Sequence, residues 1–433
     1  MKLCVIGLGK LGYPMAEFLS SSGLSINCYD KNEKHLLDLK NGKQYLKFER
    51  GLEGYKKNNN DLNYTFNIND ALKGTEICFI TVPTPSLRKG NFDNSYIIEV
   101  LNNVSENLKN NSIDKPYVIN INSTVMPGSF KNELIPYMEK RGLKKDIDFS
   151  FIYNPYFVAL GDVIKGLENP DFILVGYDNQ KAKNKLSQVY NKIYKRNLIT
   201  DLNLEEAEYV KLLINSYLTL KISFANMVKM ICNSNENIKV SNILKVIGFD
   251  SRIGEKYLKT GGPFSGPCLP RDVEALKFDS KRKNINYHVA DASSKTNEQI
   301  LTFLKNDLIK FKDLNIKTII FAGIGYKANT PSLEETYVLE LSDYLIKNNF
   351  KVYFYDDYIS DKIPNLERID SKNLDKYSSL IFLPYVDQKF NSLNFKGYIY
   401  DIWEQIEGSN VVRSFLDIKK QNLSNIISLR KKN

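Results

Sequence analysis

The chain has 433 residues, of which 42% are hydrophobic and 25% charged, the proportions of a soluble globular protein with two or three domains. No apolar stretch approaches the ~18 residues that span a bilayer, and residues 1–8 lead into glycines without a cleavage site, so we expect no membrane span and no signal peptide. The net charge of +10 comes from lysines spread over the whole length, so a phosphorylated small molecule is a better candidate partner than nucleic acid.

The cysteines lack the spacing of metal ligands, so we predict no metal site. All but one fall within predicted strands or helices and are interpreted as small buried hydrophobic residues of a protein in the reducing cytoplasm. Cys268 alone falls in a predicted loop. The five cysteines are Cys4, Cys28, Cys78, Cys232 and Cys268.

The first 30 residues have the pattern of a dinucleotide-binding fold. A buried strand over residues 2–6 leads into Gly7-Leu8-Gly9-Lys10-Leu11-Gly12, a helix is predicted through Ser22, and a second strand over 25–29 ends at Asp30. The glycines permit a tight turn and close approach of a pyrophosphate to a helix N-terminus. An acid after the second strand can accept the ribose hydroxyls and would repel a 2′-phosphate, which favours NAD over NADP.

Four further strands are predicted at residues 77–82, 118–121, 149–153 and 172–175. Each ends in a small or turn-forming motif: Pro83-Thr84-Pro85, Asn122-Ser123-Thr124, Asn154-Pro155 and Gly176. Ligands of doubly wound sheets bind at the carboxyl ends of the strands, so these motifs are expected beside the cofactor. Taken singly, each could simply mark a turn.

The middle of the chain is predicted to be helical. A long helix over residues 204–234 carries Lys211 and Asn215, which lie one turn apart on the same face. Such a pair is usually solvated, but apolar neighbours on both sides make partial burial plausible. Further helices are predicted over residues 240–247 and 289–311.

A loop rich in glycine and proline runs from Lys259 to Asp272 and contains Cys268. A thiol on such a turn, four residues before a carboxylate, can serve as a nucleophile with a base nearby. An ordinary buried cysteine fits this segment equally well when it is taken alone.

A second α/β pattern follows, with strands over residues 318–323, 352–355, 380–383 and 398–401 and a helix over 336–347. The predicted fold class is therefore α/β, with two Rossmann-like doubly wound parallel sheets joined by a helical segment. The predicted domains are an NAD-binding domain (1–199), a central helical domain that contains the cysteine loop (200–312) and a C-terminal α/β domain (313–433). The basic end, Arg430–Asn433, is predicted to fray.

Together these motifs resemble those of the nucleotide-sugar 6-dehydrogenases, the UDP-glucose/GDP-mannose dehydrogenase family, over nearly the whole chain. The stretch from Asp250 to Gly254 and its spacing to Cys268 look most like the UDP-glucose branch. The matching pieces are Gly7–Gly12, Pro83–Pro85, Ser123–Val125, Tyr153–Pro155, Glu206–Lys211 with Asn215, Asp250–Gly254, Gly266–Asp272, and Tyr326-Lys327 with Asn329-Thr330.

The resemblance implies two successive oxidations at C6 of a nucleotide sugar by NAD. Cys268 would trap the intermediate aldehyde as a thiohemiacetal, and the later thioester would be hydrolysed. Lys211 and Asn215 would stabilise the developing oxyanion and hold a water, while Asp272 and Thr124 would position or activate water. A homodimer through the central helices is also implied.

The resemblance further implies two sets of binding residues. For the cofactor they are Gly7, Gly9, Lys10, Leu11, Gly12, Asp30, Pro83, Thr84, Ser123, Thr124 and Arg271. For the substrate they are Tyr156, Lys211, Asn215, Arg252, Lys259, Gly262, Phe264, Ser265, Tyr326 and Lys327.

The sequence departs from the family pattern in four places. Tyr156 and Leu160 stand where the family has glutamates, the first of which acts as acid or base in hydrolysis. Ser265 replaces a glycine, Glu334 an arginine that contacts the cofactor, and Trp403 an arginine that contacts the substrate. Loss of a general base typically costs about 10²–10⁴ in rate.

Three hypotheses therefore stay open. The first is an NAD-dependent oxidase of the C6 hydroxyl, with UDP-glucose to UDP-glucuronate the best candidate reaction. The second is a dehydrogenase for another UDP- or GDP-sugar, or one that stops at the aldehyde. The third is a catalytically weakened protein that binds nucleotide sugars.

Overall fold

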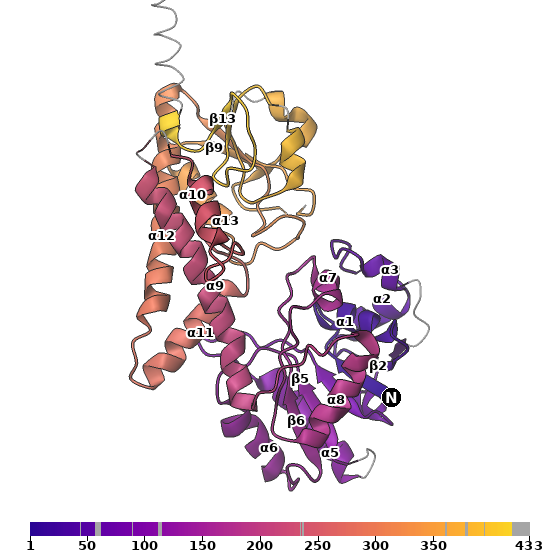
Figure 1. Ribbon diagram of the computed structural model, residues 1–433. Coiled ribbons are helices and arrows are strands. Elements are labelled where there is room, and N and C mark those ends of the chain that lie inside the picture. The colour runs from indigo at the N-terminus through magenta and orange to yellow at the C-terminus, as the bar shows by residue number, and fades with distance from the viewer. Residues whose placement is uncertain are drawn as a thin grey trace, which may run out of the picture. The chain divides into compact units, whose positions relative to one another are not determined.

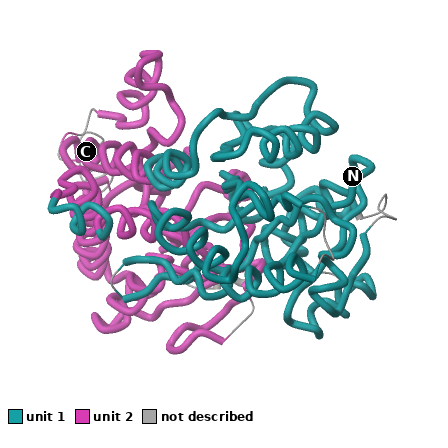
Figure 2. The backbone as a smooth tube through the Cα atoms, turned by 90° about the horizontal axis from the view of Figure 1, so that it is seen from below, with its two compact units in different colours: residues 1–214, 278–284 teal, residues 215–277, 285–433 magenta. Residues whose placement is uncertain are grey.

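The computed structural model describes residues 1–43, 45–56, 62–88, 90–110, 115–233, 235, 238–359, 362–376, 380–393 and 395–417. The chain forms two compact units, residues 1–214 with 278–284 and residues 215–277 with 285–433 (Figure 2). The proposed division into three domains stays a prediction, and the basic end at 430–433 lies outside the described residues. In the described part of the chain, no helix is both long and apolar enough to cross a membrane.

The first unit contains a seven-stranded sheet in the order β3-β2-β1-β4-β5-β6-β7. Its strands β2, β5 and β6 are labelled in Figure 1. Its strands are parallel except for the last pair, in which β7 runs antiparallel to β6. The strands are β1 (Lys2–Ile6), β2 (Ser25–Tyr29), β3 (Leu62–Tyr64), β4 (Ile77–Ile80), β5 (Tyr117–Ile121), β6 (Phe149–Tyr153) and β7 (Gly176–Tyr177).

Helices cover both faces of this sheet, so the strands are buried on both sides and appear in the sequence as continuous apolar runs. Side chains alternate between the two faces of a strand. Leu3 and Val5 of β1 therefore pack in the core on one face of the sheet, and Cys4 and Ile6 pack in the core on the other face. The helices are α1 (Gly12–Ser20), α2 (Glu33–Lys40), α3 (Leu52–Lys56), α4 (Ile68–Leu72), α5 (Ser95–Lys109), the π-helical η1 (Phe130–Leu134), α6 (Ile135–Lys140), α7 (Val163–Glu168) and α8 (Gln180–Ile193).

The strand predicted at residues 172–175 was wrong. Ile173 forms only an isolated parallel bridge with Ile199, and the regular strand is β7, directly after the predicted range. The Val175 N–H donates to the Thr200 hydroxyl over 2.9 Å instead of to a neighbouring strand, which interrupts the ladder.

The second unit contains a six-stranded parallel sheet in the order β10-β9-β8-β11-β12-β13, with buried cores on both faces. Two parallel α/β sheets with helical segments confirm the predicted fold class. The strands are β8 (Thr318–Phe321), β9 (Lys351–Phe354), β10 (Glu367–Arg368), β11 (Leu380–Phe382), β12 (Tyr398–Tyr400) and β13 (Val411–Val412).

The central helices include one that the sequence did not predict. The glycines and prolines predict a loop that continues to Asp272, but helix α11 already begins at Leu269. Pro270 fits there because the first-turn N–H groups of a helix have no acceptor within the helix. The helices are α9 (Leu204–Cys232), α10 (Val240–Phe249), α11 (Leu269–Arg282), α12 (His288–Ile309) and α13 (Tyr337–Lys347), with 3₁₀ turns η2 (Lys310–Leu314), η3 (Ser371–Lys376) and η4 (Gln388–Ser392).

Candidate active site

Three glycines shape the turn between β1 and α1 for different reasons. Gly7 has a φ of +93°, a left-handed conformation that other residues rarely adopt. A Cβ on Gly12 would collide with the Gly7 carbonyl, so Gly12 lets the helix pack against the turn. A Cβ on Gly9 would meet no protein atom within 4 Å. The bare backbone at Gly9 therefore borders open space, as the close approach of a pyrophosphate requires.

The surroundings of this turn also fit a dinucleotide. Asp30 accepts the Leu8 N–H over 2.8 Å through one oxygen and the Asn32 N–H over 2.9 Å through the other, which places its carboxylate beside the turn. Lys10 is exposed. Leu11 occupies the N-cap position of α1 without a side-chain cap, and the first turn of α1 carries no acidic residue, so α1 itself places no anion at its positive end.

Side chains at the ends of β4 and β5 tie the neighbouring turns together. The Thr84 hydroxyl donates to the Thr124 carbonyl over 2.7 Å, and the Ser123 hydroxyl donates to the Val82 carbonyl over 2.6 Å. Thr84 and Ser123 are buried, Thr124 is half-buried and Pro83 is exposed. The structure thus brings these predicted residues to the carboxyl edge of the sheet, as the topology requires.

Lys211 lies on α9 and is buried. Its ammonium donates to the Tyr156 carbonyl over 2.8 Å and lies 4.4 Å from the centre of the Phe157 ring. One turn earlier, the Glu208 carboxylate accepts the Gly128 N–H over 2.6 Å and the Phe130 N–H over 3.0 Å. Glu208 therefore anchors the segment that follows Thr124 to the helix that carries Lys211, although the sequence reading assigned it no role.

The Tyr156 side chain joins a buried hydrogen-bond network. Its hydroxyl lies 2.7 Å from the Tyr190 hydroxyl, which in turn donates to Asn154. Asn154 also accepts a bond of 2.7 Å from Asn122 through its carbonyl. Burial raises the pKa of Tyr156 to about 12, so the phenol stays protonated at neutral pH and cannot act there as a general base.

In the second unit, Cys268 directly precedes α11 and is exposed, whereas Cys4, Cys28 and Cys78 are buried. The Asp272 N–H donates to the Cys268 carbonyl over 2.9 Å, which is the first backbone bond of the helix. A thiol at a helix N-terminus lies at the positive end of the helix dipole, which favours its nucleophilic thiolate.

Asp272 lies one turn after Cys268 and is buried. It accepts the Asn215 side-chain N–H over 2.6 Å, and the Arg271 Nε lies 3.6 Å from its other oxygen. Arg271, predicted to contact the cofactor, thus pairs with the adjacent carboxylate. The first backbone hydrogen bond of α11 thus joins the residue that carries the thiol to the residue that carries the carboxylate.

The loop before Cys268 is packed under three aromatic rings. A Cβ on Gly261 would overlap the Trp403 ring, one on Gly262 the Tyr337 ring, and one on Gly266 the Tyr326 ring. Gly266 also has a φ of +85°. Glycine is therefore required at all three positions by close packing, and at Gly266 by backbone conformation as well.

Two asparagines outside the predicted set hold the same loop. Asn226 on α9 accepts the Gly261 N–H over 3.0 Å and donates to the Gly262 carbonyl over 3.1 Å. Asn297 on α12 accepts the Phe264 N–H over 2.7 Å and donates to its carbonyl over 2.9 Å. Asn226 has a sequence signal, since it is an amide in a largely apolar helical stretch, whereas Asn297 lies among polar residues and has no such signal.

The remaining predicted substrate residues differ in their exposure to solvent. Arg252 is exposed and pairs with Asp250 over 2.6 Å. Lys259 is exposed, Phe264 is buried, and Ser265 and Lys327 are half-buried.

The turn after β8 repeats the geometry of the cofactor turn. Gly323 has a φ of +115°, and the Ile324 N–H donates to Asp356 over 3.1 Å, just as the Leu8 N–H donates to Asp30. Here, however, the Tyr385 hydroxyl occupies the space beside Gly323 that a Cβ would take. The second sheet thus keeps a Rossmann-like turn, but the Tyr385 side chain fills the space beside Gly323.

Two family models match the chain: the NAD binding domain of the UDP-glucose/GDP-mannose dehydrogenase family over residues 1–194 and the central domain of the same family over residues 205–299. The UDP-glucose 6-dehydrogenase of Rickettsia bellii is 30% identical over 82% of this chain and 81% of its own length. This chain belongs to the UDP-glucose/GDP-mannose dehydrogenase family.

Membership makes the chain an NAD-dependent nucleotide-sugar dehydrogenase. The UDP-glucose 6-dehydrogenase of Rickettsia felis is 29% identical over 93% of this chain and 90% of its own length. A solved UDP-glucose dehydrogenase of Pyrobaculum islandicum has a TM-score of 0.83 and covers 95% of this chain and 98% of its own, at 23% identity, which supports the fold. The predicted cofactor NAD and the predicted family are both confirmed.

Two departures from the family pattern have visible structural consequences. At position 156 this dehydrogenase has a phenol bound to Tyr190 in place of a carboxylate. At position 403 it has an indole packed on Gly261 in place of a guanidinium. Half-buried Leu160 supplies no carboxylate either.

Proposed function

We propose that this enzyme oxidises the C6 hydroxyl of UDP-glucose twice and releases UDP-glucuronate. The observation that carries the proposal is the exposed Cys268 at the start of α11 with buried Asp272 one turn later. The Rickettsia relatives are named UDP-glucose 6-dehydrogenases, which supports this sugar.

The Gly7–Gly12 turn would hold NAD⁺, which when bound would supply the hydride acceptor for both oxidations. After the first oxidation, the Cys268 thiolate adds to the aldehyde carbon, and the oxygen takes up a proton to give a thiohemiacetal. Loss of a hydride and a proton from this adduct gives a thioester. Water then adds to the thioester carbon, and the C–S bond breaks to release the acid and regenerate the thiol. Because the thiol must stay reduced, we place the enzyme in the cytoplasm.

Other side chains would support these steps. The Lys211 ammonium would stabilise the oxyanion that develops at C6. Asn215 would hold Asp272 ready to take a proton from the hydrolytic water, and Thr124 would help to place that water. In this proposal Asp272 is the general base, since Tyr156 stays protonated at neutral pH.

We propose that the nucleotide sugar binds the second sheet and the cysteine loop through Arg252, Lys259, Gly262, Phe264, Ser265, Tyr326 and Lys327. Tyr326 supports this assignment because its ring packs directly on Gly266, two residues before the thiol. A nucleotide held at Tyr326 and Lys327 would therefore bring its sugar to the cysteine loop.

A second candidate function is favoured by the network at Tyr156. Without a carboxylate at positions 156 and 160, hydrolysis of the thioester could be too slow for a second oxidation to turn over. The productive reaction would then be a single oxidation, after which the C–S bond of the thiohemiacetal breaks, the hydroxyl loses its proton and the aldehyde is released. The substrate in this case would be UDP-glucose or another UDP- or GDP-sugar.

The stoichiometry of NADH distinguishes these candidates. Purified protein is incubated with NAD⁺ and a panel of UDP- and GDP-sugars, and NADH formed is compared with sugar consumed. Two NADH per UDP-glucose support the proposal, one supports release of the aldehyde, and none with any sugar despite binding would refute both. A Cys268→Ala variant that still forms two NADH per sugar would refute the role of the thiol.

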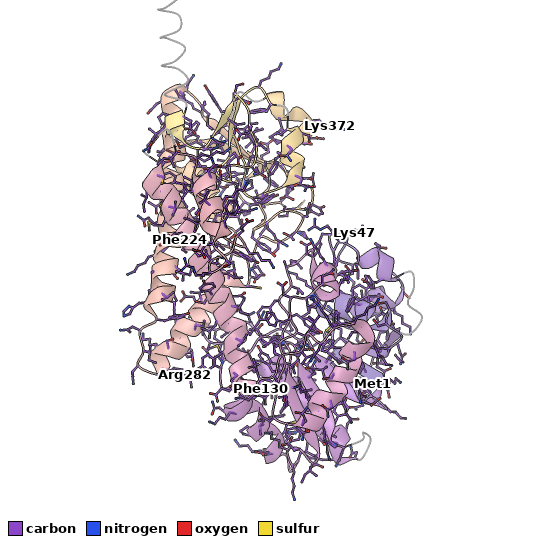
Figure 3. All side chains as sticks on the ribbon, in the orientation of Figure 1. Met1, Lys47, Phe130, Phe224, Arg282 and Lys372 are labelled. Carbon is purple, nitrogen blue, oxygen red and sulfur yellow. The ribbon has the colours of Figure 1, made fainter. Side chains whose placement is uncertain are left out.

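We also propose a homodimer through α9. Tyr217, Phe224 and Ile231 recur every seven residues on this helix and are all exposed, so they form one apolar stripe (Phe224 is labelled in Figure 3). Val246 and Phe249 add exposed apolar surface on α10. Light scattering should give the mass of a dimer for the parent protein and that of a monomer for Phe224→Asp. A monomeric parent protein would contradict the proposal.

A further inference from the structure

One histidine contacts the cofactor turn and has no role in the chemistry described above. The ring Nε2 of His35, on α2, lies 2.9 Å from the Leu8 carbonyl, and because a carbonyl only accepts, the ring is the donor. The N–H of the same residue, Leu8, donates to Asp30 over 2.8 Å. Both backbone polar groups of Leu8 are thus held by side chains that follow β2.

The His35 ring is itself fixed. Its backbone N–H donates to the Asn32 side chain over 3.0 Å, which caps α2. The Tyr45 ring meets the imidazole edge-on, with 4.4 Å between centroids, and the Tyr13 ring on α1 lies 6.0 Å from Tyr45. His35 is therefore placed by its own helix and by a neighbouring ring, so its bond to Leu8 can restrain the turn.

The planarity of the peptide bond transmits this restraint to Gly9. The Leu8 C=O and the Gly9 N–H belong to one trans peptide unit and point to opposite sides of it. With the carbonyl held towards α2, the Gly9 N–H points away from α2. Within the described ranges no acceptor bonds this N–H, and a Cβ at Gly9 would meet no atom within 4 Å. The bond from His35 to the Leu8 carbonyl thus directs the Gly9 N–H away from α2, and Gly9 itself borders open space.

We propose that His35 is a positioning residue for the dinucleotide, which orients the Gly9 N–H towards the pyrophosphate. It acts through the backbone and makes no contact of its own with the reacting atoms. The inference rests on NAD as the cofactor and is independent of which sugar is oxidised.

The test compares His35→Phe with His35→Gln. Phenylalanine keeps a ring against Tyr45 but removes the donor, whereas glutamine keeps an N–H at similar reach. Fluorescence titration should show NADH binding about 3- to 10-fold weaker in His35→Phe, the range expected for one hydrogen bond, and near-parental binding in His35→Gln. ADP-ribose, which contains the pyrophosphate, should lose affinity to the same extent in competition, while adenosine should not.

His288→Phe, which changes the other histidine of the chain, is the matched control and should bind NADH like the parent. Parental NADH affinity in His35→Phe, or an equal loss for adenosine, would overturn the proposal. If His35→Phe does not fold, His35→Asn and His35→Gln apply the same test, because only the longer amide reaches Leu8. Equal affinities of that pair would also refute the role. No sugar is present, so the outcome is separate from that of the sugar-oxidation assay.

Discussion

The Asn215 side-chain amide donates to the Asp272 carboxylate over 2.6 Å, and both residues are buried. The bond joins α9 to the first turn of α11, directly after the thiol of Cys268. It fixes the orientation of the carboxylate and uses part of its accepting capacity. Because the phenol at position 156 cannot take a proton at neutral pH, this carboxylate is the better candidate for the base in thioester hydrolysis.

Replacement of Asp272 by asparagine should therefore slow the hydrolytic step by about 10²–10⁴ while the oxidations remain. Stopped-flow absorbance should show a burst of NADH followed by a slow steady state, and mass spectrometry should find the acyl group on Cys268. Glu274→Gln, an exposed position on the same helix, is the control and should keep the parental steady state. An unchanged steady-state rate in Asp272→Asn would assign the base to another residue.

Tyr156→Phe should leave the pH dependence of kcat unchanged between about pH 6 and 9, because a phenol with a pKa of about 12 does not titrate in that range. The variant loses the 2.7 Å bond to Tyr190 and should unfold with a free energy lower by about 1 kcal/mol. Profiles of kcat against pH measure the first effect, and urea unfolding measures the second. Disappearance of the basic or acidic limb of the profile would mean that the phenol transfers protons after all.

The two glycines Gly9 and Gly12 should respond differently to alanine. Gly9→Ala should keep the melting temperature, since its Cβ meets no protein atom, yet weaken NADH binding about tenfold or more because the methyl intrudes where the pyrophosphate binds. Gly12→Ala should lower the free energy of unfolding by several kcal/mol, because its Cβ collides with the Gly7 carbonyl. Thermal melts and NADH titrations of both variants provide the comparison. A destabilised Gly9→Ala with unchanged affinity would contradict the assignment of the turn.

Glu208 should make stability depend on pH. Burial raises its pKa from 4.5 to about 7 in the folded protein, so between these values the folded state binds more protons than the unfolded state. The stabilisation from this group is fully present below about pH 4.5. It is lost as the pH rises to about 7, which lowers the free energy of unfolding by up to roughly 3 kcal/mol.

Urea unfolding of the parent and of Glu208→Gln at pH 5 and pH 8 tests this linkage. Glutamine does not titrate, so the parent should lose stability relative to the variant as the pH rises. A constant difference between the two proteins would show that the carboxyl does not titrate in this range.

The sequence predicted those parts of the fold whose signal lies within a few residues. The strands at 25–29 and 149–153 coincide with β2 and β6, because strands buried on both faces appear as short continuous apolar runs. The dinucleotide turn was equally visible, because its glycines and Asp30 are linked by fixed backbone geometry. Helix α11 was missed because Pro270 and its neighbours favour a turn as much as the first turn of a helix.

By itself, then, the sequence determined the fold class, the cofactor turn and the thiol with a carboxylate four residues later. Only the tertiary structure decided that Tyr156 turns to Tyr190, that Trp403 packs on Gly261 and that Asn215 holds Asp272. It also placed His35 against the Leu8 carbonyl. These pairs are far apart in the chain, and their contacts depend on how whole elements pack, which no local pattern of residues encodes.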